Sequence, residues 1–288
     1  MLKLLLLIFF FVSCSEQERE KTTSKEEERK NVKVAALQYY SRMGDKDYNW
    51  KLSSKLITSA SENGAVIVVL PEAAITGYMD PAEEITWTSG SPSAGEISIQ
   101  NNAETVDGDF IKKYMKLADE LNIYLTIPFV EKAKEKFYNS VILCSPKGEL
   151  LIHHRKKSLW THGDSGWCEE GGLPPKVVET EYGRLGVMIC YDVHSMPKIL
   201  ADLKADIVLY SVGWYGPNTE DWYKVRFPNK HVIPNNFSVV AANWSHEKGK
   251  KGWPGCGWSN VTYRNGVVLN ITSKIAGEDI VYAKIPLN

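Results

Sequence analysis

The sequence has no excess of basic residues, no internal repeat and no apolar run long enough to cross a membrane. Its 288 residues include 34 Lys and Arg against 35 Asp and Glu, so the net charge is −1 at pH 7. Without a basic surface to attract a phosphate backbone, we exclude nucleic acid as a partner. Residues 4–12 form an uninterrupted apolar run, about half of the roughly 20 residues that a membrane-spanning helix needs.

Cysteine is also scarce, and its spacing argues against a fold held together by disulfides. Five cysteines occur, and those beyond the N-terminal region are Cys144, Cys168, Cys190 and Cys256. A chain of this length can bury a sizeable core and does not need disulfides to fold. A disulfide between Cys168 and Cys256 remains an alternative. At least one thiol must stay reduced if a cysteine serves as a nucleophile.

The N-terminal 31 residues are expected to lie outside the folded domain. Residues 1–13 combine an early lysine, the short apolar run and a small residue at its end, which is typical of an export signal peptide. Residues 14–31 are almost entirely polar, so they cannot bury enough surface to fold, and we interpret them as a tether. The boundary FVSC at 11–14 resembles a bacterial lipobox. The resemblance implies that Cys14 is lipidated and that the lipid anchors the protein to a bacterial membrane, on its periplasmic or outer surface. Secretion of a soluble protein is the alternative.

The remainder, residues 32–288, is predicted to form one α/β domain. Short apolar or β-branched runs bounded by turn residues indicate strands, and segments with apolar residues at helical spacing indicate helices. The expected strands are 32–37, 65–70, 122–130, 137–144, 149–154, 186–190, 206–212, 237–243, 257–263 and 267–271, and the expected helices are 50–63, 108–121 and 195–203. Helices that alternate with strands and hairpins imply a mixed sheet covered by helices.

Three polar residues stand at the ends of apolar, strand-like runs. Glu72 follows residues 65–71, Lys156 follows 150–155 and Cys190 follows 185–189. Because ligands in α/β proteins bind beyond the carboxyl ends of strands, these residues are candidates for one site. Taken singly, each is more often an exposed carboxylate, a surface lysine or an inert buried thiol.

Taken together, the three segments resemble the signature blocks of the nitrilase, or carbon–nitrogen hydrolase, superfamily. The blocks read PEAAITGY at 71–78, HRKKSL at 154–159 and GRLGVMICYD at 183–192, with further similarity in VAALQ at 34–38, YNS at 138–140, AAN at 241–243 and GWS at 257–259. The resemblance covers nearly all of residues 32–288. It implies a four-layer α-β-β-α sandwich that tends to form homodimers or higher homo-oligomers, and chemistry that requires no metal or cofactor.

The resemblance also implies a role for each residue. Cys190 is the nucleophile, Glu72 is the general base that takes its proton, and Lys156 and the backbone N–H of Tyr191 stabilise the oxyanion. Lys157 is the alternative lysine. Family members place this lysine directly after a basic residue, which is Arg155 here, so the resemblance favours Lys156. Many members carry a second acid between the lysine and the cysteine. The candidates for that acid are Asp164, Glu169 and Glu170.

The residues after the nucleophile bear on the substrate. Cys190 is followed by Tyr191-Asp192, whereas true nitrilases usually have Trp-Glu there, so resemblance to the amidase-like branch implies a small amide or N-carbamoyl substrate. The alternatives are a pantetheinase- or biotinidase-like amide hydrolase, which suits an exported protein, and a catalytically inactive, tethered binding lipoprotein, which the complete triad argues against. Aromatic residues expected to flank the cleft and bind substrate are Trp160, Trp214, Tyr215 and Trp258.

Overall fold

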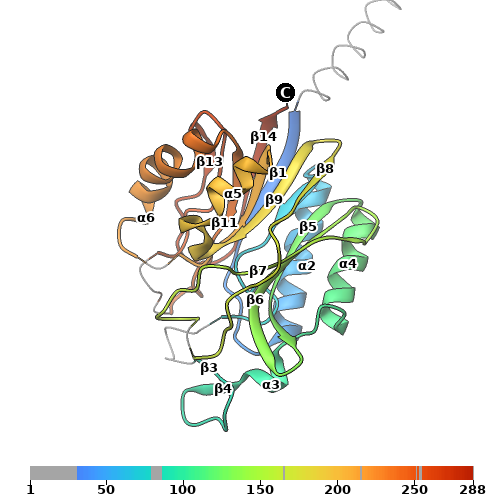
Figure 1. The fold of residues 1–288 in the computed structure, drawn as a ribbon, viewed down its shortest axis with the longest axis vertical. Helices are drawn as coiled ribbons and strands as arrows, with labels where there is room; N and C mark the ends of the chain where they lie inside the picture. The colour runs from blue at the N-terminus through green and yellow to red at the C-terminus, as the bar shows by residue number, and fades with distance from the viewer. Residues whose placement is uncertain are drawn as a thin grey trace, which may run out of the picture.

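The computed structural model describes residues 31–78, 86–164, 166–214, 216–250, 252 and 255–287, and Figure 1 shows how they fold. The expected signal peptide at 1–13, Cys14 and all of the tether except Asn31 lie outside the described residues. The expectations for these segments therefore stay predictions. No helix within the described ranges is both long enough and apolar enough to span a lipid bilayer.

The first sheet has six strands in the order β14-β1-β2-β5-β6-β7. Their bounds are β1 (Asn31–Gln38), β2 (Ile67–Val69), β5 (Tyr124–Ala133), β6 (Lys136–Cys144), β7 (Leu150–Arg155) and β14 (Asp279–Pro286). Strands β1, β2 and β5 run parallel, and β7 shares their direction because it follows two antiparallel steps from β5 through β6. The carboxyl ends of β2 and β7 therefore point toward the same end of the sheet.

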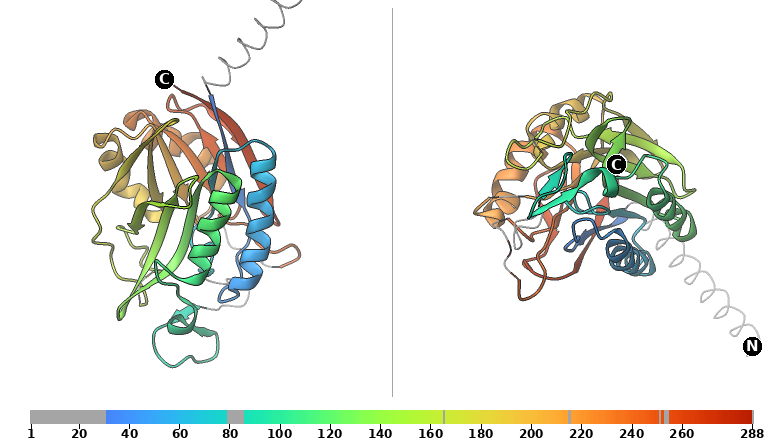
Figure 2. Two further views of the ribbon diagram at one scale, coloured as in Figure 1. Left: turned by 90° about the vertical axis from the view of Figure 1, so that its right-hand side faces the viewer. Right: turned by 90° about the horizontal axis from the view of Figure 1, so that it is seen from below.

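Two long helices cover the outer face of this sheet. Helices α2 (Lys46–Glu62) and α4 (Asp109–Leu121) lie side by side in the left view of Figure 2. Helix α2 begins before the expected start at residue 50 because Asp45 caps it and accepts a hydrogen bond from the Tyr48 N–H. The apolar stripe of each helix, including Ile57 and Ile111, packs into a buried cluster with strand residues.

The second sheet also has six strands, in the order β13-β12-β11-β10-β9-β8. Their bounds are β8 (Val177–Thr180), β9 (Gly183–Ile189), β10 (Ile207–Ser211), β11 (Ser238–Ala242), β12 (Asn260–Thr262) and β13 (Val268–Ile271). Helical segments accompany this sheet: η1 (Cys190–His194), α5 (Met196–Asp202), α6 (Thr219–Asp221), the π-helical turns η2 (Trp222–Arg226) and η3 (Pro228–Val232), and η4 (Ile233–Asn235). Strands β9, β10 and β11 run parallel.

The two sheets pack face to face, and the side chains between them form the main core. One buried cluster joins Val34 and Val69 from the first sheet with Val187 and Val239 from the second. Helices lie on the two outer sides, as Figure 2 shows from below. This helix–sheet–sheet–helix arrangement confirms the four-layer α-β-β-α sandwich.

Two edge strands and a small separate sheet go beyond the elements that the sequence patterns predict. Strand β14 pairs along the whole of β1, with Pro286 opposite Asn31, and β8 pairs with β9. Strands β3 (Thr86–Thr88) and β4 (Glu96–Ser98) with the short helix α3 (Ile99–Asn102) project at the bottom of Figure 1. These strands are short or lie at a sheet edge, so their sequences lack the continuous apolar run of a central strand.

Candidate active site

Glu72, Lys156 and Cys190 meet at the ends of strands from both sheets. Glu72 lies shortly after β2, Lys156 directly follows β7, and Cys190 directly follows β9. Since β2 and β7 belong to the first sheet and β9 to the second, the site is assembled where the two sheets adjoin. All three side chains are buried, and Cys190, with 7% of its surface exposed, is the most accessible.

The Lys156 ammonium lies between two carboxylates. Its Nζ is 2.8 Å from Glu72 Oε1 and 2.7 Å from Asp164 Oδ2. The three side chains are at most 1% exposed, so none of the charges is screened by bulk water. Buried charges are tolerated when they are paired and hydrogen-bonded, and here each carboxylate balances part of the ammonium charge.

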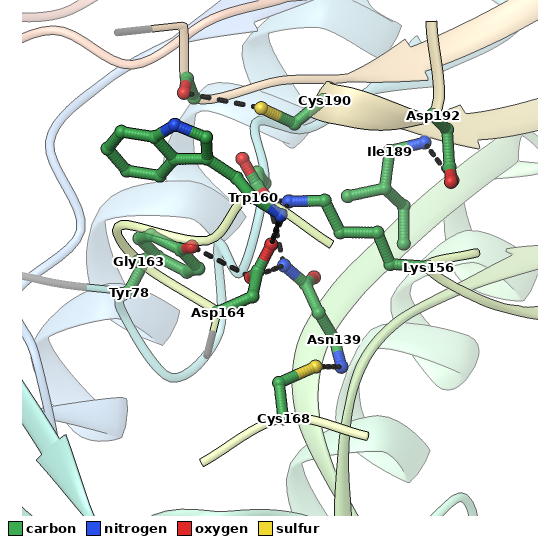
Figure 3. A network of polar contacts seen from close by, with 12 residues as sticks. Tyr78, Asn139, Lys156, Trp160, Gly163, Asp164, Cys168, Ile189, Cys190 and Asp192 are labelled. Atoms are coloured by element: carbon green, nitrogen blue, oxygen red, sulfur yellow. Dashed lines mark hydrogen bonds and ion pairs between the residues drawn. The ribbon is translucent and has the colours of Figure 1, made fainter. Parts of the chain in front are cut away.

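Further donors orient both carboxylates, and Figure 3 shows those around Asp164. Asn139 Nδ2 donates to Glu72 Oε1 at 2.7 Å and also reaches Asp164 Oδ1 at 3.3 Å. The Tyr78 hydroxyl donates to Asp164 Oδ1 at 2.7 Å, and the backbone N–H of Trp160 donates to Asp164 Oδ2 at 2.8 Å. Asp164 is thus held pointing inward, toward Lys156.

Cys190 sits on a tight turn from β9 into η1. Its φ is +38°, in the left-handed region that non-glycine residues rarely adopt. The Tyr210 hydroxyl donates to the Cys190 carbonyl at 2.7 Å, and the thiol lies 3.5 Å from the Gly213 carbonyl oxygen. Such strained backbone persists where surrounding contacts hold it, and it occurs often at functional sites.

Burial and charge together shift the proton affinities of the three groups. Burial raises the pKa of the Glu72 carboxyl, and the Lys156 ammonium opposes this without cancelling it. Burial raises the pKa of the Cys190 thiol well above its ordinary range, and the Glu72 carboxylate adds to the effect. For Lys156, burial alone would lower the pKa, but Glu72, Cys190 and Asp164 raise it well above its ordinary value. The resting site therefore holds an ammonium, a neutral thiol and a carboxylate with increased affinity for a proton.

Glu72 is also tied through its backbone to the second sheet. Its carbonyl accepts a hydrogen bond from Trp244 Nε1 at 2.7 Å, and its N–H faces the Val212 carbonyl at 3.5 Å. Asn243 extends the link, because its side-chain oxygen accepts from the backbone N–H groups of Trp214 and Trp244. Glu72 is therefore fixed relative to the sheet that carries Cys190.

Of the three candidates for a second acid, the structure brings Asp164 to the site. Glu169 lies 3.3 Å from Lys136 with about half of its side chain exposed, and Glu170 is exposed. Among the two neighbouring lysines, Lys156 carries the buried ammonium, whereas Lys157 is partly exposed.

The aromatic residues expected to bind substrate occupy different places. Trp160 contributes its backbone N–H to the site, and the Trp214 ring stacks on Trp222 at 4.4 Å. Trp258 lines a groove of about 830 Å³ in which Glu72, Lys156 and Cys190 take no part, and the Lys224 ammonium lies 5.3 Å from its ring centre. Tyr215 lies outside the described residues.

Asn139 and Tyr78 are the site residues that sequence reasoning missed. Both stand inside the matched segments, and a polar Asn139 facing inward from an apolar hairpin strand is the signal that could have found it. The Cys168 thiol accepts the Asn139 backbone N–H at 3.3 Å, and no disulfide joins Cys168 to Cys256. Within the described part of the chain, no group of His, Cys, Asp or Glu side chains is arranged to hold a metal ion.

Comparison with known proteins places this architecture in a family. Residues 33–288 match the family model described as carbon-nitrogen hydrolase. The chain belongs to the carbon-nitrogen hydrolase family. The match covers both sheets, and it confirms the resemblance seen in the sequence and the assignment of the chain as a hydrolase.

Relatives of this carbon-nitrogen hydrolase include amidases and nitrilases. It is 29% identical over 255 residues to omega-amidase NIT2 of Bos taurus, a match that covers 84% of each chain. It is 28% identical over 223 residues to a nitrilase of Pyrococcus abyssi, covering 76% of this chain and 78% of that protein. A cysteine-to-alanine variant of an amidase from Nesterenkonia sp. AN1, in complex with butyramide, has the same fold, with a TM-score of 0.75 at 21% identity over 90% of this chain and 92% of that one.

Proposed function

We propose that this hydrolase cleaves the C–N bond of a small amide or N-carbamoyl compound, with Cys190 as the nucleophile. The observation that carries the proposal is the buried contact of Lys156 with Glu72 and Asp164 beside the Cys190 thiol. This arrangement combines a nucleophile, a base and an electrostatic stabiliser in one water-poor site, which is what acyl transfer requires.

In the first half-reaction, Glu72 takes the proton of the Cys190 thiol while the sulfur attacks the amide carbon. The raised pKa of the Glu72 carboxyl favours this proton transfer. The Cys190 thiol needs a base to become a thiolate, because burial raises its pKa as well. A C–S bond forms, and the electron pair of the carbonyl moves onto oxygen to give a tetrahedral oxyanion.

Lys156 and the backbone N–H of Tyr191 are the proposed donors to that oxyanion. Tyr191 follows the nucleophile within the turn Cys190–His194, and N–H groups in the first turn of a helix have no partner inside it. Lys156 stays protonated because the surrounding negative charges raise its pKa. Loss of one such donor lowers the rate of acyl transfer by about 10²–10³-fold.

Collapse of the intermediate breaks the C–N bond, and protonated Glu72 gives its proton to the leaving amine or ammonia. The acyl group remains on Cys190 as a thioester. Glu72 then takes a proton from a water molecule whose oxygen attacks the thioester carbon. The C–S bond breaks, the proton returns to the Cys190 sulfur, and one water has been consumed for each acid and amine formed.

Three findings support an amide over a nitrile. Tyr191-Asp192 after the nucleophile departs from the Trp-Glu of true nitrilases, and the Bos taurus relative is an omega-amidase. A cysteine-to-alanine variant of the Nesterenkonia amidase was obtained with butyramide, and another variant with the acetamide moiety of fluoroacetamide added covalently at its active-site cysteine. Small amides thus reach the cysteine of a protein with this fold.

A substrate panel tests the class of compound. We would assay small aliphatic amides, N-carbamoyl amino acids, pantetheine and aliphatic nitriles through the release of ammonia or amine. The proposal expects turnover of amides or N-carbamoyl compounds and little turnover of nitriles. A nitrile hydrolysed faster than every amide would overturn it, and pantetheine as sole substrate would favour the pantetheinase-like alternative. No turnover, with Cys190 also inert toward iodoacetamide, would favour the inactive lipoprotein.

A pair of cysteine variants tests the nucleophile. Cys190→Ala should abolish turnover and leave the circular dichroism spectrum and melting temperature close to those of the parent. Cys144→Ala is the matched control, because that buried thiol packs between the first sheet and its helices, outside the site, and its loss should leave turnover intact. Acid-quenched mass spectrometry should find the acyl mass on Cys190 in the parent. Full activity in Cys190→Ala would end the mechanism.

We also propose that the protein is exported and anchored through a lipidated Cys14, with residues 14–31 as its tether. The fold supports this arrangement because the described chain begins at Asn31, at the amino end of β1, whereas the site lies beyond the carboxyl end of the parallel strand β2. The length of β1, about 25 Å, would separate the tether from the site, which would face away from the membrane. Intact mass of the membrane-extracted protein should show an acylated Cys14 as first residue. A soluble protein with another N-terminus would indicate secretion.

A further inference from the structure

Asp192 makes contacts that no step of the proposed mechanism uses. Its side chain is fully buried on the turn that begins with Cys190. Oδ1 accepts hydrogen bonds from the backbone N–H of Lys157 at 2.8 Å and from that of Ser158 at 2.9 Å. One carboxylate oxygen near the nucleophile therefore holds the two residues that follow Lys156.

The second oxygen of Asp192 contacts both catalytic segments. Oδ2 accepts from the backbone N–H of Ile189, the residue before Cys190, at 3.1 Å, and Figure 3 shows this bond. The same oxygen lies 2.8 Å from Nε2 of His154, two residues before Lys156. The carboxylate thus has four hydrogen-bond partners, three from the segment around Lys156 and one beside Cys190.

Lys156 and Cys190 follow strands of different sheets, so the hydrogen bonds of Asp192 connect segments that belong to different sheets. The sheets are held together mainly by apolar side chains, whose attraction has no preferred direction. Hydrogen bonds have a narrow range of length and angle, so they can fix a separation more closely than apolar packing does. Trp244 and Val212 provide such bonds between Glu72 and the second sheet.

We infer that Asp192 is a positioning residue that sets the separation between the Lys156 ammonium and the Cys190 sulfur, an inference that rests on the proposed function. Through Lys157 and Ser158 it holds the backbone that directs the lysine. Through Ile189 it holds the turn in which Cys190 keeps its left-handed conformation. Asp192 itself touches neither substrate nor the reacting atoms.

The substitution Asp192→Asn tests the inference. The amide keeps the size of the carboxylate, but its NH₂ group cannot accept from a backbone N–H. Asp192→Asn therefore loses either the bonds from Lys157 and Ser158 or the bond from Ile189. We expect kcat to fall roughly 10- to 100-fold, because a displacement of about 1 Å at a catalytic group has that effect, while KM changes by less than about threefold.

Asp206→Asn is the matched control. Asp206 accepts the backbone N–H of Arg184 at 2.9 Å, near the opposite end of β9, where no catalytic residue lies. Both variants should melt at a lower temperature than the parent. Only Asp192→Asn should lower kcat when each protein is assayed well below its melting point. Equal kcat in both folded variants would overturn the positioning role.

Two His154 variants keep the test decisive if Asp192→Asn does not fold. His154→Leu removes one of the four partners of Asp192, whereas His154→Gln retains a side-chain N–H donor. We expect His154→Leu to lower kcat and His154→Gln to restore most of it. Equal activity in the two variants would contradict the inference.

The rate at which iodoacetamide alkylates Cys190 gives a readout that needs no substrate. If Asp192 keeps the ammonium beside the sulfur, Asp192→Asn should slow this alkylation, followed by mass spectrometry, and Asp206→Asn should not. An unchanged alkylation rate in Asp192→Asn would count against the inference. If Cys190→Ala retained turnover, the proposed function would fail; if it lost turnover while Asp192→Asn kept its kcat, only the positioning role would fail.

Discussion

Glu131 offers a quantitative test of how polar contacts stabilise the first sheet. The residue lies on β5, on the helix-facing side of the sheet, and is 1% exposed. Its carboxylate accepts hydrogen bonds from Arg155 Nε at 3.0 Å and Nη2 at 2.5 Å, and from the Ser140 hydroxyl at 2.6 Å, and it lies 2.8 Å from His153 Nε2. These partners come from β6 and β7, so one buried charge joins three strands.

The shift in the pKa of Glu131 gives the size of the effect. Burial alone would raise this pKa, but the hydrogen bonds from His153, Arg155 and Ser140 outweigh burial and lower it from 4.5 to about 2. At about 1.36 kcal/mol per pKa unit, this corresponds to about 3 kcal/mol of stability at neutral pH. Because the folded-state pKa is lowered, the contribution is complete above about pH 4.5 and is lost as the pH falls from there toward 2.

Urea unfolding of Glu131→Gln measures this contribution. We expect the variant to lose about 3 kcal/mol of unfolding free energy at pH 7, and the difference from the parent to shrink as the pH approaches 3. Glu135→Gln, at an exposed position in the adjoining hairpin turn, is the control and should change stability by less than about 0.5 kcal/mol. A loss below about 1 kcal/mol at pH 7, or the same loss at every pH, would refute the reasoning.

Substitutions around the site give further predictions. Lys156→Ala should lower kcat by at least about 10²-fold and Lys157→Ala should leave it within about twofold, as steady-state kinetics would show; the reverse ranking would mean that the wrong lysine was chosen. Asp164→Asn should lower kcat by roughly tenfold and change KM little, because the Lys156 ammonium would lose one of its two charged partners. Asn139→Ala removes a hydrogen bond that lowers the pKa of Glu72. The acid limb of the pH profile of kcat/KM should therefore move to higher pH, and an unmoved limb would exclude Glu72 as the base. If the chain forms the homodimer that the resemblance implies, light scattering should give about twice the mass of one chain, and the monomer mass would contradict it.

Local patterns in the sequence are sufficient to predict the strands that carry the site. The runs before Glu72 and Cys190 are continuously apolar because both faces of these strands are buried, and such runs stand out in any sequence. The ends of these apolar runs can be recognised in the sequence for the same reason, and they lie close to the ends of β2 and β9. The edge strands β8 and β14 lack this signal, because β14 becomes a strand through its pairing with β1, far away in the sequence.

The sequence by itself determined the family, the fold class and the positions of Glu72, Lys156 and Cys190, because these depend on short segments read one at a time. Only the tertiary structure decided which other side chains reach Lys156. Asp164, Glu169 and Glu170 are equally polar in the sequence, yet Asp164 alone of these three turns inward, where Tyr78, 86 residues away, and Asn139 hold it. The direction of a side chain in a loop depends on contacts between segments that are distant along the chain, and those contacts exist once the two sheets have packed together.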